Sequence, residues 1–208
     1  NTNNELTFLD AIMSSKYALL AQRNHITQLR STIPNDTRFN QQWQYINTGS
    51  NGGVEGADLD IDLAWDHTTG GVTADGDTIV ACIIDTGMNA NHPDAGDNIW
   101  VNYDEVPDNG IDDDGNGYID DVRGWNAVTG NDDVYVGGGH GTQVAGVIGA
   151  QGNNEIGVTG VNWDVKMMIV RGNSPESVAI ASYAYPYTMR KIYNETNGDR
   201  GAFVVSTN

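Results

Sequence analysis

The hydrophobic positions of this chain gather in short, nearly continuous runs that long polar stretches separate. Apolar residues fill most of 79–84, 165–170 and 202–205. A run of this length is typical of a strand that is buried on both faces of a parallel sheet. The pattern therefore predicts three parallel strands at these places.

Two segments between these runs carry apolar residues at helical spacing. The first predicts a buried helix over 141–150. The second predicts a helix over 177–195, which Pro186 is expected to kink or split. Strand, helix, strand, helix and strand in this order are typical of an α/β fold, in which helices cover both faces of a parallel sheet as three layers, αβα.

The N-terminal part has a different pattern. Apolar residues recur at three- and four-residue spacing over 5–20 and predict an amphipathic helix, with Thr7 and Asp10 as its capping box. Residues 21–60 show no clean period and are rich in Asn, Gly and Gln. We interpret them as an extended arm that wraps a domain.

Composition narrows the function classes. The 208 residues, 38% of them hydrophobic, suffice for one domain with a core. Acidic residues outnumber basic ones 28 to 10, which gives a formal net charge of −18 and argues against unaided binding to nucleic acid or to an anionic membrane. No apolar stretch approaches the length of about 18 residues that a membrane span needs. The single cysteine, Cys82, excludes an internal disulfide.

The acidic residues are concentrated in one segment. Residues 91–133 hold 12 carboxylates, and Arg123 is their only basic neighbour. Asp112-x-Asp114-x-Asn116-Gly-Tyr matches the opening of a calcium loop, because oxygen ligands alternate before a glycine turn. The twelfth position, where an EF-hand has Glu, is Arg123, so a shorter loop of about 102–123 is expected. The candidate ligands of this structural Ca²⁺ are Asp108, Asp112, Asp114, Asn116, Tyr118, Asp120 and Asp121. The alternative is a solvated acidic loop that aids solubility.

Two turns carry candidate catalytic side chains. Asp85 follows the run 79–84 directly, at the carboxyl end of a predicted strand, where ligands bind in open α/β sheets. His140 follows three glycines and opens the predicted helix over 141–150. Considered singly, Asp85 could be a turn or cap residue, and His140 could be a structural histidine that backbone groups satisfy.

Together these turns resemble two motifs of the subtilisin-like serine proteases, the subtilases. The aspartate motif is Ile-Ile-Asp-Thr-Gly at 83–87, followed by Asn-His-Pro-Asp at 91–94, and the histidine motif is Gly-His-Gly-Thr-Gln-Val-Ala-Gly at 139–146. The resemblance covers roughly 34–208. Gln143 departs from it, because the family commonly has His there, although this is not a triad position.

The resemblance implies a three-layer subtilisin-like sheet and a secreted, calcium-stabilised serine endopeptidase acting on polypeptides. Asp85 would orient His140, and His140 would be the general base. Asp94 would be a ligand of a separate calcium site. The chain has no Gly-Thr-Ser motif for the nucleophile, so it is expected to be the N-terminal half of a catalytic domain, with a C-terminal fragment of the same protease as its partner.

Three questions stay open from the sequence. Residues 1–33 resemble either a propeptide remnant or an N-terminal extension of the mature enzyme. The chain corresponds to a protease cleaved after Asn208 or to a shortened chain. A non-catalytic calcium-binding module, or an inert processing fragment on a protease scaffold, is the alternative function.

Overall fold

The computed structural model describes residues 11–17, 32–135, 139–172 and 174–208. The chain divides into two compact units, Asn1–Arg30 and Ser31–Asn208. In the first unit the described residues 11–17 include a short helical turn. The rest of the helix predicted over 5–20, with its capping residues Thr7 and Asp10, lies outside the described residues.

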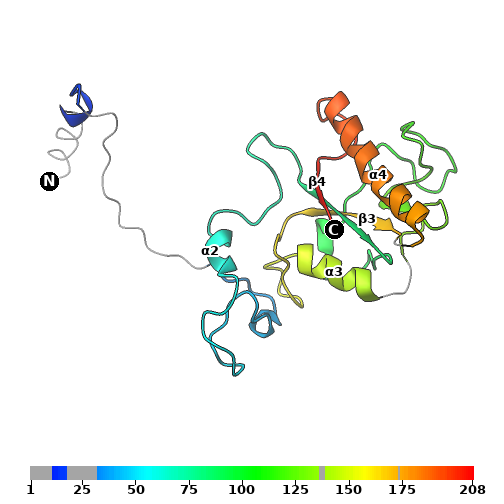
Figure 1. Cartoon of the computed structure of the whole chain (residues 1–208). Coiled ribbons are helices and arrows are strands. Elements are labelled where there is room, and N and C mark those ends of the chain that lie inside the picture. Colours follow the sequence, from blue (N-terminus) through cyan, green and yellow to red (C-terminus); the bar gives the residue numbers. More distant parts are fainter. Residues whose placement is uncertain (1–10, 18–31, 136–138, 173) are drawn as a thin grey trace. The chain divides into compact units, whose positions relative to one another are not determined.

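The second unit contains a parallel sheet of four strands (Figure 1). The strands are β1 (Val80–Asp85), β2 (Gly124–Asn126), β3 (Lys166–Arg171) and β4 (Val204–Thr207), in the spatial order β2-β3-β1-β4. In the central pair, Val80 aligns with Lys166 and Asp85 with Arg171. This register brings the carboxyl ends of β1 and β3 to the same edge of the sheet.

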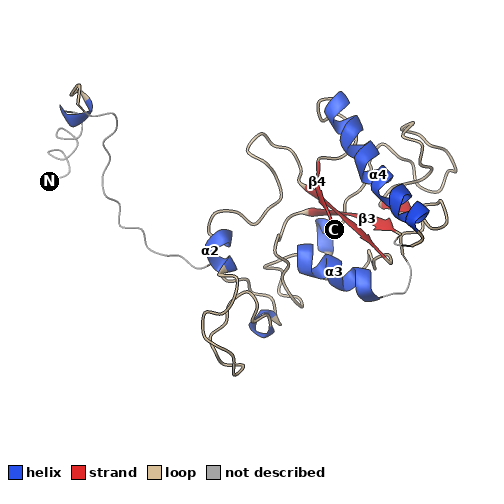
Figure 2. Cartoon of the chain, in the orientation of Figure 1, coloured by secondary structure: helices blue, strands red, loops and turns tan. Residues whose placement is uncertain are grey.

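Two helices cover opposite faces of this sheet, α3 (Gly139–Gly149) and α4 (Glu176–Glu195) (Figure 2). Successive strand residues point to opposite faces, so each strand supplies both layers of the core. The layer beneath α3 includes Ala81, Ile83, Met167 and Ile169, packed with Ala145. The layer beneath α4 includes Val80, Cys82, Met168 and Val170, packed with Tyr185 and Met189. The predicted α/β fold with a parallel sheet is confirmed.

Two element predictions need correction. The strand predicted at 202–205 begins two residues later, at Val204, because Gly201 turns the chain with a φ of 81°. Pro186 does not split α4, which runs continuously through it. Tyr185 and Met189 on either side of the proline are fully buried against the sheet, and this packing holds the helix together.

No helix in the described part of the chain has both the length and the hydropathy needed to cross a bilayer.

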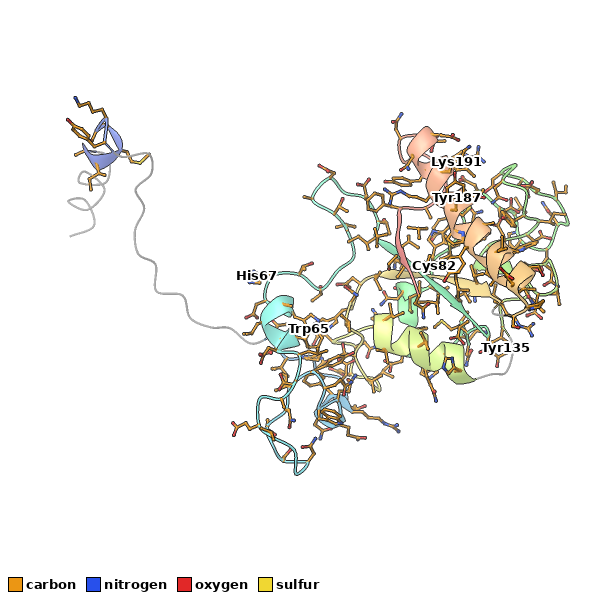
Figure 3. The ribbon with its side chains drawn as sticks, in the orientation of Figure 1. Trp65, His67, Cys82, Tyr135, Tyr187 and Lys191 are labelled. Carbon is orange, nitrogen blue, oxygen red and sulfur yellow. The ribbon has the colours of Figure 1, made fainter. Side chains whose placement is uncertain are left out.

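The polar arm also contains structure that the pattern did not predict. Residues 39–41 form a short 3-10 helix and α2 (Ile61–Trp65) follows it. Trp65, which Figure 3 labels at α2, packs with its ring 4.9 Å from that of Trp163 and donates its indole N–H to the Val161 carbonyl at 2.9 Å. The arm from residue 34 onward is therefore anchored by its own aromatic cluster. Strand β2 was missed because three residues are too few to show a period.

Candidate active site

Asp85 and His140 meet at the carboxyl edge of the sheet. His140 Nδ1 lies 2.9 Å from Asp85 Oδ1 and 2.8 Å from Asp85 Oδ2. The two residues are 55 positions apart in sequence, and the contact joins the end of β1 to the first turn of α3. The candidate pair from the sequence is thus brought together.

A glycine makes this close approach of helix and strand end feasible. A Cβ on Gly141 would lie 2.2 Å from the Gly87 carbonyl oxygen and 3.1 Å from Asp85 Cβ. One neighbour is the backbone of the turn after β1 and the other is the Cβ of the last residue of β1, so neither can rotate out of the way as the end of a long side chain would. The Thr142 hydroxyl accepts the Asn89 N–H at 3.0 Å and fastens the same helix turn to the same loop.

The Asp85 carboxylate is held in its ionised form. Burial raises its pKa, but hydrogen bonds from the Thr86 backbone and from His140 outweigh burial, so the net shift of the Asp85 pKa is downward. The Thr86 N–H and hydroxyl both donate to Asp85 Oδ1, at 2.6 and 3.0 Å. These bonds fix the carboxylate plane toward His140 and leave Oδ2 free of Thr86.

The His140 ring is open to solvent on its other side. The side chain of His140 is 72% exposed, against 11% for Asp85. A carboxylate only accepts hydrogen bonds, so Nδ1 carries a proton, and in the neutral form of the ring Nε2 is then the acceptor. An exposed Nε2 with its tautomer set by a buried carboxylate is suited to take a proton from a hydroxyl and to return it.

The acidic loop contains a second site. Oxygens of Glu105, Asp114 and Asp121 lie within 4.8 Å of one another. Asp121 is 0% and Glu105 5% exposed. Glu105 was not among the predicted ligands, because it precedes the alternating Asp motif by seven residues and no local spacing connects it to that motif. Its place among the buried carboxylates required the fold.

Asp121 is the fully buried member of this cluster. The Tyr185 hydroxyl of α4 donates to Asp121 Oδ2 at 2.5 Å, and Asn102 Nδ2 donates to Oδ1 at 3.2 Å. Burial raises the pKa of Asp121 to about 6, although the bonds from Tyr185 and Asn116 act in the opposite direction. Three carboxylates in such a place form a donor set that suits a hard divalent cation.

The other predicted ligands have varied surroundings. Asp112 accepts the backbone N–H groups of Asn116 and Gly117, and Asp120 accepts those of Asn109 and Gly110. These two carboxylates brace the loop backbone instead of joining the buried cluster. Asn116 Nδ2 donates to both Asp114 and Asp121, which brings it into the cluster. Asp108 adopts a positive φ of 61°, and Tyr118 packs its ring against Trp125 and Tyr185.

Asp94 lies in a different place, beside a loop at 152–158. It is 4% exposed, and its Oδ2 accepts the Val158 N–H at 2.9 Å. Asp36 joins the same loop, where its Oδ2 accepts the Asn153 N–H at 2.7 Å while its Oδ1 is buried without a hydrogen-bond partner. Burial raises the pKa of Asp36, and the charge of Asp94 adds to the rise. The sequence analysis did not single out Asp36, since one Asp in a polar arm carries no local signal.

Comparisons with known proteins agree on one family. A model described as the subtilase family matches residues 76–206. Over 165 residues the chain is 34% identical to the "Subtilisin-like protease 1" of Plasmodium vivax, which covers 78% of this chain and 24% of that protein. It is 36% identical over 155 residues to an "Extracellular protease" of Xanthomonas campestris, covering 69% of this chain and 23% of that protein.

Among solved structures, a protease from Pseudoalteromonas arctica matches with a TM-score of 0.45 at 30% identity, over 72% of this chain and 43% of that one. The serine protease of Aeromonas sobria in complex with its chaperone matches with a TM-score of 0.47 at 25% identity, over 68% of this chain and 20% of that one. The chain thus spans less than half of each of these relatives. The family match covers well over half of the chain and includes both Asp85 and His140. The chain therefore belongs to the subtilase family.

Proposed function

We propose that this chain provides the aspartate and histidine of an Asp-His-Ser triad in a secreted, calcium-stabilised serine endopeptidase. The observation that carries the proposal is the contact of His140 Nδ1 with both oxygens of Asp85, at 2.9 and 2.8 Å, on a ring that is otherwise exposed. A structural histidine would use both ring nitrogens inside the fold. This one uses a single nitrogen and presents the other outward.

In the proposed reaction His140 moves one proton twice. Nε2 takes the proton from the serine hydroxyl as its oxygen attacks the scissile carbonyl carbon, and then gives that proton to the departing amine. A water molecule repeats the sequence and releases the acyl group. Asp85 stays ionised throughout and compensates the charge of the imidazolium, consistent with the downward shift of its pKa.

We propose that the serine comes from another segment of the same protease, the expected C-terminal fragment. The face of α3 that carries His140 is open: Gln143 is exposed, and Val147 is 57% exposed one turn further on. A cavity of about 440 Å³ lies along this face between α3, the loop at 88–95 and the arm at 38–44. Neither Asp85 nor His140 lines this cavity, so it is better suited to receive packing side chains than the scissile bond.

We propose that Ca²⁺ has a structural role at the cluster of Glu105, Asp114 and Asp121, with Asn116 beside it. Bringing three carboxylates together away from water is unfavourable unless a cation neutralises them. The described basic group that reaches this cluster is Arg200, which donates to the Asp114 carbonyl and lies 4.0 Å from Asp114 Oδ1. The bound ion would hold the insert between β1 and α3, and with it the distance from Asp85 to His140. Asp94, with Asp36, is proposed as a separate calcium site.

Secretion is also proposed, and the Xanthomonas relative, named as an extracellular protease, supports it. Residues 1–33 are proposed to derive from a propeptide or from an N-terminal extension.

Active-site labelling tests the catalytic proposal. A fluorophosphonate added to the protease that contains this chain should label a serine outside these 208 residues. His140→Ala and Asp85→Asn should lower peptide hydrolysis by the losses known for subtilisin itself, about 10⁶-fold and about 10⁴-fold. His67→Ala, which removes another histidine of the second unit, is the control and should leave the rate unchanged. Labelling that is unaffected by His140→Ala would contradict the proposal.

Calorimetric titration with CaCl₂ tests the cation site. Glu105→Gln and Asp121→Asn should each weaken binding, because each removes one charged ligand from the cluster. Asp132→Asn is the matched control: it removes one negative charge from an exposed position of the same insert. If all three variants weakened calcium binding equally, the effect would be one of net charge, and the assignment of the cluster would be wrong.

A further inference from the structure

Four asparagines in this chain are followed directly by glycine: Asn51, Asn109, Asn116 and Asn197. This dipeptide is chemically labile because the glycine, which has no side chain, lets its backbone nitrogen reach the asparagine amide. The reaction is a deamidation. The glycine nitrogen attacks the side-chain carbon Cγ, a new N–Cγ bond forms, and Nδ2 leaves as ammonia together with the proton of the glycine N–H. Water then opens the resulting succinimide ring to aspartate or isoaspartate.

At all four places the glycine N–H, whose nitrogen would attack, donates a hydrogen bond in the folded chain. The acceptors are of two kinds. The Gly52 N–H donates to the Gly49 carbonyl at 3.0 Å, and the Gly198 N–H donates to the Tyr193 carbonyl at 2.9 Å. In the acidic loop the acceptors are side chains. The Gly110 N–H donates to Asp120 Oδ2 at 3.0 Å, and the Gly117 N–H donates to Asp112 Oδ2 at 2.9 Å.

The asparagine side chains of the loop are held as well. Asn109 Nδ2 donates to Asp113 at 2.7 Å, and its Oδ1 accepts the Ile111 N–H at 2.7 Å. Asn116 Nδ2 donates to Asp114 and Asp121 at 3.0 and 3.1 Å, and its Oδ1 accepts the Tyr118 N–H at 2.7 Å. Attack on Cγ requires the glycine N–H to be released and the amide to rotate. In this loop both movements break bonds to carboxylates.

We propose that Asn109 and Asn116 are deamidation sites that the closed acidic loop protects and that its opening exposes. Their protection depends on carboxylate side chains, whose mutual repulsion opposes closure. Protection at Asn51 and Asn197 depends on backbone turns outside the loop. Opening of the loop therefore raises the deamidation rate at Asn109 and Asn116 and leaves the rate at Asn51 and Asn197 unchanged.

Reaction at Asn116 also makes the opening irreversible. Conversion to aspartate removes the Nδ2 donor to Asp114 and Asp121 and puts a further negative charge beside them. Conversion to isoaspartate also inserts an extra backbone carbon into the turn. Either product removes one of the hydrogen-bond donors of the buried cluster, while Asn102 and Tyr185 still donate to it, so the loop cannot close in its original form.

Peptide mapping by mass spectrometry after timed incubation at neutral pH tests the proposal through two variants. Asp120→Gly removes the acceptor of the Gly110 N–H at a residue whose φ of 56° glycine accepts readily, and Asp112→Ala removes the acceptor of the Gly117 N–H. Each should raise deamidation of its own asparagine by about tenfold or more, the change expected when a hydrogen bond to a charged acceptor is lost. Asp132→Ala is the control and should change none of the four rates.

A second arm omits the substitutions and adds a chelator, and this arm alone rests on the proposed calcium site. If calcium had been present at about 100 times its dissociation constant, removal should raise the rates at Asn109 and Asn116 by up to roughly 100-fold. If the deamidation rates rose in the variants but the chelator had no effect, the carboxylates would be supported as the protecting groups. Calcium would then be rejected as the cause of loop closure. Rates at Asn109 and Asn116 that stay equal to the wild-type rates in both variants would overturn the proposal.

Discussion

At the scale of single residues, the geometry of the candidate site depends on Gly141 as much as on the two side chains that are proposed to do the chemistry. Asp85 stands at a strand end and His140 at a helix start, and both ends are positioned by backbone. The two come within 2.8 Å only because nothing projects from the next helix residue toward the Gly87 carbonyl. The motif around His140 therefore encodes a close approach of two backbones as well as the proposed base.

Gly141→Ala should push α3 away from the turn after β1. The added Cβ would lie 2.2 Å from the Gly87 carbonyl oxygen, and we expect a destabilisation of about 1–3 kcal/mol, as for other overpacked sites. Urea unfolding measures the loss. The ¹⁵N and ¹H signals of the His140 ring should show that the hydrogen bond from Nδ1 has weakened.

Gly146→Ala is the matched control, because it lies in the same helix with nothing within 4 Å of the added Cβ. It should stabilise the chain by up to about 1 kcal/mol through helix propensity. Equal effects from the two substitutions would show that helix propensity, and not the contact with Gly87, governs both.

At the scale of elements, the acidic loop is tied to the sheet layer by a few polar contacts. The Tyr185 hydroxyl of α4 donates a hydrogen bond to Asp121, and Arg200, from the turn before β4, donates one to the Asp114 carbonyl. The loop is therefore part of the same packing that holds α4 on the sheet. The binding of a cation or of a proton to the loop should consequently change the stability of the whole second unit.

Without calcium, Asp121 should make the chain less stable as pH rises. Its pKa of about 6 in the folded chain lies above the unfolded value of about 3.9. The folded state therefore holds the proton more tightly between these values. This contribution is complete below about pH 4, falls as pH rises and is lost above about pH 6, a change of about 3 kcal/mol in the free energy of unfolding.

Urea unfolding in a chelator from about pH 4 to pH 7 measures this slope, and Asp121→Asn should flatten it relative to wild type. With saturating calcium the sign should reverse, because the ion binds the ionised carboxylate. A wild-type slope that Asp121→Asn leaves unchanged would assign the effect to other carboxylates.

At the scale of the whole molecule, the described sheet ends in an edge strand. β4 pairs with β1 on one side, and Val205 is 52% exposed. An unpaired edge with an apolar side chain is a template for pairing with another chain. In the proposed protease the segment that carries the serine would cover this region.

The 208-residue chain by itself should therefore associate in a concentration-dependent manner, which light scattering after size exclusion measures. Val205→Lys should reduce association, because a charged edge residue disfavours pairing. Val54→Lys is the control: Val54 is 75% exposed on a loop outside the sheet, and the substitution adds the same charge. If both variants reduced association equally, net charge and not the strand edge would be responsible.

The sequence by itself determined the elements that have a local signature. Apolar runs located β1 and β3 within one residue, helical spacing located α3, and the order of elements predicted a parallel sheet with helices on both faces. Motif order placed Asp85 and His140 in the family that the comparisons show. These features can be predicted locally because burial on two faces, a helical period and a close backbone approach each produce a recognisable pattern within a few neighbouring residues.

Only the tertiary structure decided the features that join distant segments. Glu105 enters the cluster with Asp114 and Asp121, Asp36 comes to the loop beside Asp94, and three residues form β2 because a parallel neighbour pairs with them. Pro186 lies within a continuous α4 because packing on the sheet outweighs its local preference. No spacing along the chain encodes such contacts, since they depend on how the fold brings together residues that are 9 to 117 positions apart.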